Sequence, residues 1–419
     1  MENNVWFKVD NVAKVFLASY NRRDTRSFRL TCTLKDRIDP DLLQAALHIT
    51  SMERPQYQVV LHKGLFWHYM AVTDKEVQVT EEHERPCPTL YGPDYKGTLH
   101  YSVTYWGRRI NLEMYHALTD GTGGMEFLNI LVQNYLKLRY PDELGDLTMY
   151  SGAGFADLEE NSFAKYYSRH KGDAGAKAVK SYQIRGGKLP DDQQQFFEAH
   201  MSTKEVLKRA KKCGASMTAY LGALLAMAIN EDMPSLSKYK KPVTISMPVN
   251  LRNFYKSGTS RNFFNTIYIS HVFSGDETIE SLAKEFDVSL KDEISPDKIG
   301  ARMDSFEMLE RFLLIRVVPL FIKNPAVRFF TKQEQKSVSA IISNVGKINV
   351  PDQAKDYIDS YAAYCSTDSL FITVVSYEDD LVFGISSVYK STSVLRNFIK
   401  SLTDDGIEVT VHANDVLKI

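Results

Sequence analysis

Cysteine is scarce in this chain, and its distribution excludes two kinds of site. The 419 residues contain four cysteines, which are widely scattered: Cys32, Cys87, Cys213 and Cys365. No two of them form a CxxC pair, so neither a zinc knuckle nor a redox motif is present. So few cysteines in a long chain are typical of a reducing compartment. We therefore expect a cytoplasmic protein that needs no metal.

The chain also lacks a surplus of charge and a long apolar segment. Its net charge of -1 provides no basic surface for nucleic acid, so no such partner is expected. The first residues, "MENNVWFKVDN", have neither a basic n-region nor an apolar h-region, so a signal peptide is not expected. The apolar run "FLLIRVVPLFI" (312–322) is broken by Arg316 and Pro319 and falls short of the roughly 20 residues that span a bilayer. We expect a buried helix and its turn there rather than an interfacial anchor, and no integral membrane segment.

The rest of the composition is that of a globular protein with more than one domain. Hydrophobic residues make up 44% of the chain and charged residues 25%, which are ordinary values. A polar segment rich in Gly, Pro and Asp, residues 171–195, is the best candidate for a boundary. We therefore predict an N-terminal half over residues 1–180 and a C-terminal half over residues 190–419.

Strand-like and helix-like patterns alternate in both halves. In the first half the predicted elements are a strand (27–34), a helix after Asp39-Pro40, two hairpins (57–70 and 101–116) and a helix that ends before Pro141. In the second half they are helices at 202–214 and 215–230, strands at 242–255 and 261–274, a mainly helical stretch at 277–335, a hairpin at 369–389, a helix at 391–402 and a strand at 407–413. This mixture predicts the α+β, or mixed α/β, class.

The stretch "NLEMYHALTDGTGGMEFL" (111–128) contains the strongest candidates for catalytic residues. Period-two alternation places His116 on one strand face with Ile110, Leu112 and Met114. A lone histidine on an apolar face is usually a core residue whose hydrogen bonds are satisfied. His116, however, is the last residue of the predicted strand, where side chains line crevices. A core role and a catalytic role therefore both stand at this point.

A glycine-rich turn follows the histidine. Gly121, Gly123 and Gly124 carry no side chain, so a ligand can approach the backbone there. Asp120 lies at the same junction and could orient the histidine. It could equally accept hydrogen bonds from the first amides of the helix that starts near Thr122. The two roles of the aspartate do not exclude each other.

"YHALTDG" (115–121) resembles the HxxxDG signature of the acyltransferase superfamily that includes chloramphenicol acetyltransferase, nonribosomal-peptide condensation domains, wax ester synthases and bacterial alcohol acetyltransferases. Three later segments are similar to family segments in the same order: "MPVNLR" (247–252), "RNFFNT" (261–266) and "SNVG" (343–346). The resemblance covers about residues 5–415. It is greatest with the alcohol acetyltransferase group, because Tyr115 stands where condensation domains usually have a further histidine.

The resemblance implies two chloramphenicol-acetyltransferase-like halves, with mixed sheets flanked by helices and a tunnel between them. It implies a monomer that moves an acyl group, acetyl or another short chain, from acyl-coenzyme A to a small alcohol or amine. Two alternatives remain open. One is a condensation or acyl-loading enzyme that uses an acyl carrier protein, and the other is a catalytically silent binding protein on the same scaffold.

The resemblance also assigns roles to residues. His116 would be the general base, and Asp120 would point away from the substrate and pair with an arginine, for which Arg252 is our candidate. Gly124 would support the turn. The substrate and its oxyanion would be held by donors on the turn and on the crossing segments: Gly121, Asn265 and Ser343.

Overall fold

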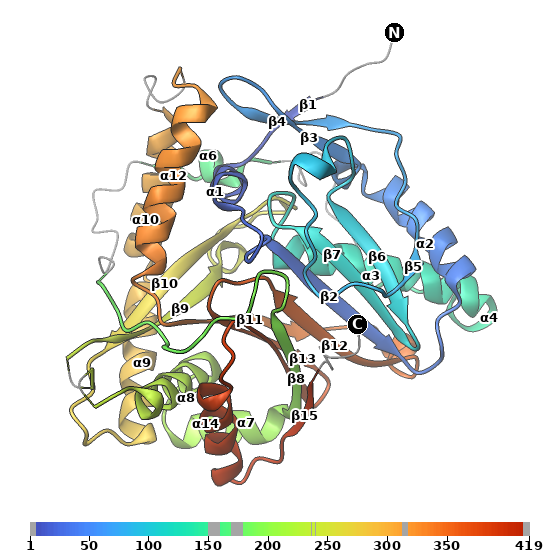
Figure 1. Ribbon diagram of the computed structural model, residues 1–419. Helices are drawn as coiled ribbons and strands as arrows, with labels where there is room; N and C mark the ends of the chain where they lie inside the picture. The colour runs from blue at the N-terminus through green and yellow to red at the C-terminus, as the bar shows by residue number, and fades with distance from the viewer. Residues whose placement is uncertain are drawn as a thin grey trace.

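The chain folds into two lobes, each built on one β-sheet with helices packed on it (Figure 1). The computed structural model describes residues 6–149, 160–168, 179–235, 237–238, 240–311 and 317–413. The predicted class is confirmed, since the two large sheets are flanked by helices and form a two-lobed α/β arrangement. Residues 171–178 of the polar segment lie outside the described part, so the proposed boundary stays a prediction.

The first lobe is a five-stranded sheet in the order β12-β2-β7-β6-β5. Its strands are β2 (Ser27–Leu34), β5 (Thr80–Glu81), β6 (Tyr101–Trp106), β7 (Arg109–Tyr115) and β12 (Ile358–Cys365). Helices α2 (Pro40–Glu53) and α3 (Gly121–Arg139) pack against each other, and α3 lies on β2. Asp39 caps α2 by accepting from the amides of Asp41 and Leu42, which confirms the helix start read from Asp39-Pro40.

The second lobe is a seven-stranded sheet in the order β10-β9-β11-β13-β14-β8-β15. Its strands are β8 (Gln195–Ser202), β9 (Val243–Asn250), β10 (Phe264–His271), β11 (Ala340–Ile348), β13 (Leu370–Tyr377), β14 (Asp380–Ser387) and β15 (Thr410–Ala413). The apolar helix α8 (Met217–Asp232) is packed among α7 (Thr203–Lys212), α9 (Ile279–Glu293) and α14 (Ser393–Asp404). No single helix in the described ranges is long and apolar enough to cross a membrane; the bent pair α7 and α8, with 81° between them, passes on length and composition alone.

A third, smaller layer covers the junction of the lobes. It contains a three-stranded sheet of β1 (Trp6–Lys8), β4 (His68–Val72) and β3 (Val59–Lys63), and the helices α1 (Asn11–Ser19), α6 (Ser162–Lys165), α10 (Pro296–Arg311) and α12 (Leu320–Gln335). Short elements complete the described fold: η1 (Pro55–Tyr57), η2 (Pro93–Tyr95), η3 (Leu251–Asn253), α4 (Pro141–Leu144) and α13 (Asp352–Lys355). Helix α1 packs between α12 and the first lobe (Figure 1).

The two lobes are interlocked by the chain that crosses between them. Strand β11 pairs with β9 only through Ala340 and Ile341, and from there it follows β13 instead. Its last residue, Ile348, is buried in the core of the first lobe. Strand β12 then pairs antiparallel with β2, so the first sheet is completed by a strand from late in the sequence. The segment "SNVG" therefore lies on the crossing strand, as expected.

The apolar run at 312–322 departs from the expected burial. Of its described residues, Leu320 is buried, but Val317, Phe321 and Ile322 are exposed. Pro319 precedes α12, and this helix packs on α1. The prediction of a buried helix is therefore wrong for this part of the run, because the apolar side chains that follow Leu320 point outward.

The three glycines of the turn have different environments. A Cβ atom at Gly124 would lie 2.8 Å from the ring of Phe28, and one at Gly123 would lie 2.7 Å from the carbonyl oxygen of Ser260. At Gly121 nothing lies within 4 Å of such an atom. The expectation that all three clear space for a ligand is therefore wrong for two of them. Gly123 and Gly124 allow α3 to approach its neighbours, and only Gly121 faces open space.

We predict that Gly124→Ala lowers the free energy of unfolding by about 1–2 kcal/mol, because the methyl group overpacks the contact with β2 and only part of this is offset by the better helix propensity of alanine. Gly121→Ala is the matched control, with no change beyond about 0.5 kcal/mol. Urea denaturation followed by circular dichroism measures both. Equal effects of the two substitutions would contradict this account of α3.

Candidate functional site

His116 lies directly after β7, at the start of the turn into α3. The strand ends at Tyr115, one residue earlier than expected, and the His116 amide donates to the carbonyl oxygen of Arg26 at 2.8 Å. The half-buried imidazole is surrounded by aromatic rings from α1, β2 and β10. The centroid distances are 4.4 Å to Phe16, 5.0 Å to Phe28 and 5.6 Å to Phe264. Elements of all three layers of the fold thus meet at this one histidine.

Asn262 fixes the tautomer of His116. The amide nitrogen of Asn262 donates to the carbonyl oxygen of His116 at 3.0 Å and to the carboxylate of Asp10 at 3.2 Å. Both partners are acceptors, so the amide oxygen must be the atom that faces Nδ1 of His116, at 3.0 Å. An amide oxygen can only accept, so the ring proton lies on Nδ1. Nε2 is left with a free electron pair, which is what a general base requires.

The protonation state fits the same role. Burial among the aromatic rings lowers the pKa of His116 below its ordinary value of 6.5, against the opposing effects of the Asp120 charge and of the hydrogen bond that Nδ1 donates to Asn262. The imidazole is therefore neutral at pH 7. A neutral ring with a bare Nε2 is ready to take a proton.

Asp120 is buried and accepts four hydrogen bonds. Its Oδ1 accepts from the amides of Thr122 and Gly123, both at 3.1 Å, and so caps α3. Its Oδ2 accepts from the Phe263 amide at 2.8 Å and from Nη1 of Arg252 at 2.7 Å. The ion pair with Arg252 is present as expected. The capping role and the bracing role coexist, because each uses a different carboxylate oxygen.

Arg252 holds the loop between β9 and β10. Its Nε and Nη2 donate to the carbonyl oxygen of Thr259 at 3.2 and 2.8 Å, and Nη2 also donates to that of Arg261 at 2.7 Å. Its Nη1 additionally donates to the side chain of Asn250 at 3.2 Å. The next residue after Arg261 is Asn262. The guanidinium therefore positions the asparagine that in turn holds His116.

Asn262 is the residue that the sequence reasoning missed. The segment "RNFFNT" contains two asparagines, and the second one, Asn265, was assigned to the substrate. In the structure Asn265 is buried on β10 with the parity of Ile267, which belongs to the core of the second lobe, whereas Phe264 packs on His116. The signal available in the sequence is that this one motif contains two asparagines, so either could have been the functional residue.

The proposed substrate residues lie on β10, β11 and α3, and none of them forms a hydrogen bond with His116 in the described contacts. Among the described contacts, the side-chain nitrogen of Asn265 has no partner although it is buried. Ser343 is half-buried on β11, beyond the point where that strand leaves β9. Gly121 is the first residue of α3, and its amide is not among those that Asp120 accepts from. Their roles in binding stay predictions.

Tyr115 fills the position where condensation domains usually carry a further histidine. It is fully buried, and its ring stacks on that of Tyr91 with a centroid distance of 5.0 Å and 10° between the planes. Its side chain belongs to the apolar cluster formed with α1 and β3, which includes Ala13 and Leu61. Packing therefore accounts for this residue, and it has no place beside the imidazole of His116.

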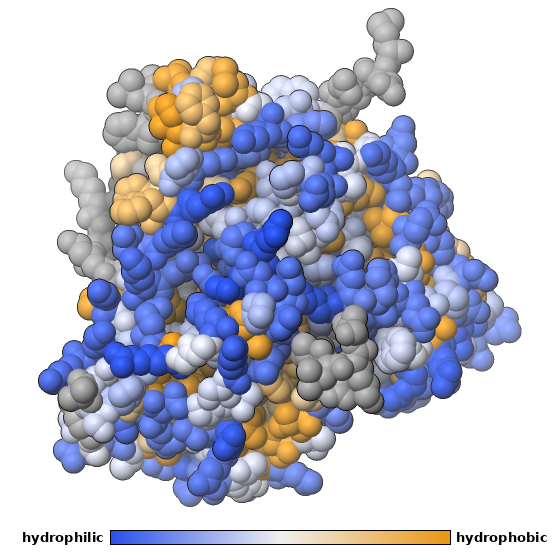
Figure 2. Space-filling view, viewed as in Figure 1, coloured by the Kyte–Doolittle hydropathy of each residue, from blue (hydrophilic) through white to orange (hydrophobic). Residues whose placement is uncertain are grey.

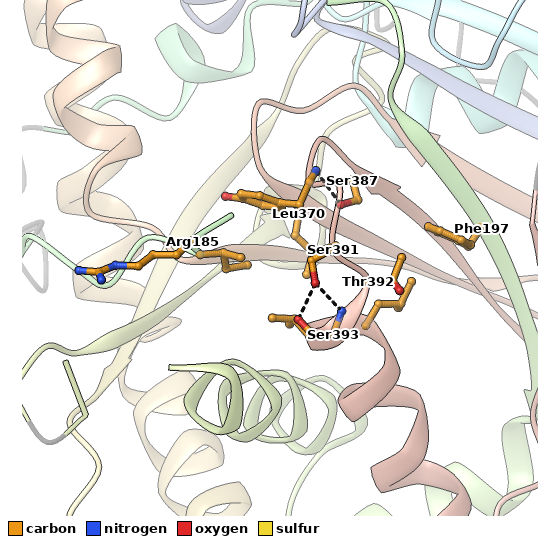
Figure 3. Close-up of a pocket in the computed structure, with 11 residues that line it drawn as sticks. Arg185, Phe197, Leu370, Ser387, Ser391, Thr392 and Ser393 are labelled. Atoms are coloured by element: carbon orange, nitrogen blue, oxygen red, sulfur yellow. Dashed lines mark hydrogen bonds between the residues drawn. The ribbon is translucent and has the colours of Figure 1, made fainter. Parts of the chain in front are cut away.

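Two pockets of the described structure lie in the second lobe, and neither is lined by His116. The first is a small cavity of about 10 Å³ at the start of α14, which has room for one water molecule (Figure 3). There the amide of Ser393 donates to the hydroxyl oxygen of Ser391 at 3.2 Å. The second is an open hollow of about 440 Å³ beside His200 and Asp380. The tunnel expected beside His116 stays a prediction. Within the described residues, no three His, Cys, Asp or Glu side chains are grouped to hold a metal ion.

Comparisons with known proteins establish the fold. No family model and no curated protein matches this chain. Solved structures do match over nearly its full length. The first condensation domain of the calcium-dependent antibiotic synthetase has a TM-score of 0.64 and 14% identity, with 97% of this chain and 99% of that chain covered. The trichothecene 15-O-acetyltransferase from Fusarium sporotrichioides has a TM-score of 0.64 and 11% identity, with 96% and 94% covered.

A third similar structure holds C8-CoA and Leu-SNAC. It is the starter condensation domain of rhizomide synthetase in complex with C8-CoA and Leu-SNAC, with a TM-score of 0.61, 11% identity, and 94% of this chain and 93% of that chain covered. The chain has the two-lobed fold shared by condensation domains and an acetyltransferase. At these identities the likeness shows the fold alone, and the relation to alcohol acetyltransferases stays a prediction.

We predict that Asp120→Asn destabilises the protein by about 3–5 kcal/mol, the usual cost of leaving a buried ion without its partner. Asparagine can still cap a helix, but both carboxylate oxygens of Asp120 accept from two N–H groups. In either orientation, the amide nitrogen of asparagine would therefore face two donors. Chemical denaturation measures the loss, and we expect activity to fall with it.

The double variant Asp120→Asn/Arg252→Gln tests whether the loss comes from the ion pair. The two effects should be far from additive, because the second substitution removes the unpaired charge. Full additivity, or an Asp120→Asn variant as stable as the parent, would contradict the bracing role.

Proposed function

We propose that the protein is an acyltransferase that moves an acyl group, acetyl or another short chain, from coenzyme A to an alcohol or amine, with His116 as general base. The observation that carries this proposal is the fixed tautomer of His116. Asn262 holds the proton on Nδ1 and leaves Nε2 free to accept another. In the described contacts no donor occupies Nε2, so this nitrogen is available as a general base.

The reaction uses the two protonation states of the imidazole in turn. Nε2 takes the proton of the hydroxyl or amine as this nucleophile attacks the thioester carbonyl. The tetrahedral intermediate then collapses, the carbon–sulfur bond breaks, and the imidazolium returns the proton to the leaving thiolate. The lowered pKa of His116 keeps the starting base neutral at pH 7. Positioned proton transfer of this kind contributes about 10²–10⁴-fold to the rate.

The oxyanion of the intermediate requires hydrogen-bond donors. We assign this role first to the amide of Gly121, the first residue of α3, because the helix dipole favours negative charge there and nothing lies within 4 Å of a Cβ atom placed on this residue. Asn265 ranks below Gly121 as a donor: its buried side-chain nitrogen has no partner in the described contacts, but its side chain lies on the opposite face of β10 from Phe264, the residue that packs on His116. Ser343 contributes a hydroxyl from the crossing strand. Asp120, Arg252 and Gly124 support the turn and touch no substrate.

Coenzyme A is our proposed donor, which is supported by a similar structure that holds C8-CoA and by the acetyltransferase of the same fold. The similarity to condensation domains supports an acyl carrier protein as the alternative donor. The two donors are separated by one assay. Acyl-coenzyme A thioesters and acylated carrier protein are each incubated with alcohols and amines, and free thiol release is followed. Release from neither donor would leave the silent binding protein as the better account.

We predict that His116→Ala yields a folded protein whose transfer rate is lower by about 10²–10⁴-fold. In the parent protein, the acid limb of kcat/KM should have its midpoint below pH 6.5, because the reactive form is the neutral imidazole and burial lowers the pKa of His116. Activity therefore falls as the pH drops through that pKa and is constant above it. His48→Ala, which changes an exposed histidine on α2, is the control. Full activity of His116→Ala would remove the histidine from the mechanism.

We predict that Gly121→Pro lowers kcat by about 10²–10³-fold while α3 is preserved. Proline is well tolerated at the first position of a helix, and Asp120 before it already has the extended backbone that proline requires (φ -94°, ψ -180°). The substitution therefore removes one N–H group and little else. Gly121→Ala keeps that N–H and is the matched control. Equal rates of the proline and alanine variants would exclude this amide as the oxyanion donor.

A further inference from the structure

Helix α12 presents its apolar side to the outside of the molecule. Phe329 and Phe330 are 58% and 70% exposed, and Phe321 and Ile322 are exposed as well. Ile322, Phe329 and Phe330 are separated by seven and eight residues, so they share one face of the helix. Leu320, the first residue of the helix, is buried, whereas Arg328 is the residue that bonds to α1. A surface helix normally has the opposite arrangement.

The exposed face of α12 continues onto the tip of the β3–β4 hairpin. The amide of Leu320 donates to the carbonyl oxygen of Leu65 at 2.8 Å, and Nζ of Lys323 donates to that of Phe66 at 2.9 Å. At this tip Leu65 is exposed and Trp67 is 53% exposed. Figure 2 shows apolar surface gathered over the end of the molecule where Figure 1 places α12 and this hairpin. We call this surface the apolar platform; it is formed by Leu65, Trp67, Phe321, Ile322, Phe329 and Phe330.

The elements that carry the apolar platform are basic. The β3–β4 hairpin, residues 59–72, contains Lys63 and no acidic residue. Helix α12 contains three basic residues, Lys323, Arg328 and Lys332, and one acidic residue, Glu334, which accepts a hydrogen bond from a tyrosine of β10. The whole chain, in contrast, has a net charge of -1. Positive charge is therefore concentrated around the exposed apolar side chains.

We propose that the apolar platform docks on an anionic lipid surface. Exposed aromatic and aliphatic side chains flanked by lysine and arginine are what the interface of a negatively charged bilayer binds, since rings enter the headgroup region and cations are attracted to the anionic headgroups. A second copy of the chain is a poorer occupant. A two-fold contact through this face would bring the basic surface of one copy against the basic surface of the other.

The platform is linked to the candidate site by α1. Helix α12 packs on α1, and Nε of Arg328 donates to the carbonyl oxygen of Ala18 at 3.1 Å. On α1, the ring of Phe16 lies 4.4 Å from that of His116. A lipid surface bound to the platform is therefore one helix away from His116. The docking itself is independent of the chemistry proposed for that histidine.

Vesicle sedimentation of the full chain tests the docking. The protein is mixed with phosphatidylcholine vesicles and with vesicles that also contain phosphatidylglycerol, and we expect binding to the anionic vesicles that weakens as salt is added. Phe321→Ser/Phe330→Ser should reduce the partition coefficient by at least about tenfold, since two rings no longer leave water. Lys63→Glu/Lys332→Glu should reduce binding to the anionic vesicles only.

The control is Trp106→Ser, which removes an aromatic side chain with 59% exposure from the tip of the β6–β7 hairpin. It should bind vesicles as the parent does, and circular dichroism confirms that each variant is folded. The proposal is overturned if the parent binds neither kind of vesicle, or if Trp106→Ser weakens binding as much as the platform variants do. It is also overturned if the platform variants change only the oligomeric state, which would identify the surface as a contact between copies.

Discussion

The buried ion pair between Asp120 and Arg252 is the contact on which the candidate site depends. It joins the first turn of α3 in the first lobe to the loop between β9 and β10 in the second. A buried pair is stable only when its remaining donors and acceptors are also satisfied. Here Asp120 also accepts from three backbone amides, and Arg252 also donates to the carbonyl oxygens of Thr259 and Arg261. The pair therefore fixes the turn, the loop and the distance between the lobes together.

The reactive state of His116 is consequently a property of the contact between the lobes. The histidine belongs to the first lobe, but Asn262, which selects its tautomer, comes from the loop that Arg252 holds. If the lobes separated, His116 would lose both the partner of Nδ1 and the ring of Phe264. The proton would then be free to occupy either nitrogen, and the pKa would return towards that of a solvated imidazole. The base is thus completed only when both lobes are in place.

Local patterns in the sequence predict local structure well and long-range contacts poorly. Alternation and capping signals are enough to place β2 and the start of α2. Asp120 and Arg252 are 132 residues apart in the sequence, and only the resemblance to a family predicts that they pair. The contact of Asn262 with His116 spans 146 residues, and no pattern marks it beyond the asparagine pair that includes Asn265. The glycines show the same limit. The sequence shows only that Gly121 and Gly124 lack a side chain, whereas the structure shows that Gly124 packs against Phe28 and that Gly121 has no such neighbour.

The exposed face of α12 shows why hydrophobicity alone does not predict burial. An apolar run indicates that its side chains will leave water, but it does not specify the surface that covers them. Leu320, at the start of α12, is buried, whereas Phe329 and Phe330, farther along the same helix, are exposed. Their exposure costs about 25 cal/mol for every Å² of apolar area left in water, and no contact in the described structure returns it. A surface outside the chain is needed to recover this free energy, and the lysines and arginine beside the rings favour one that is negatively charged.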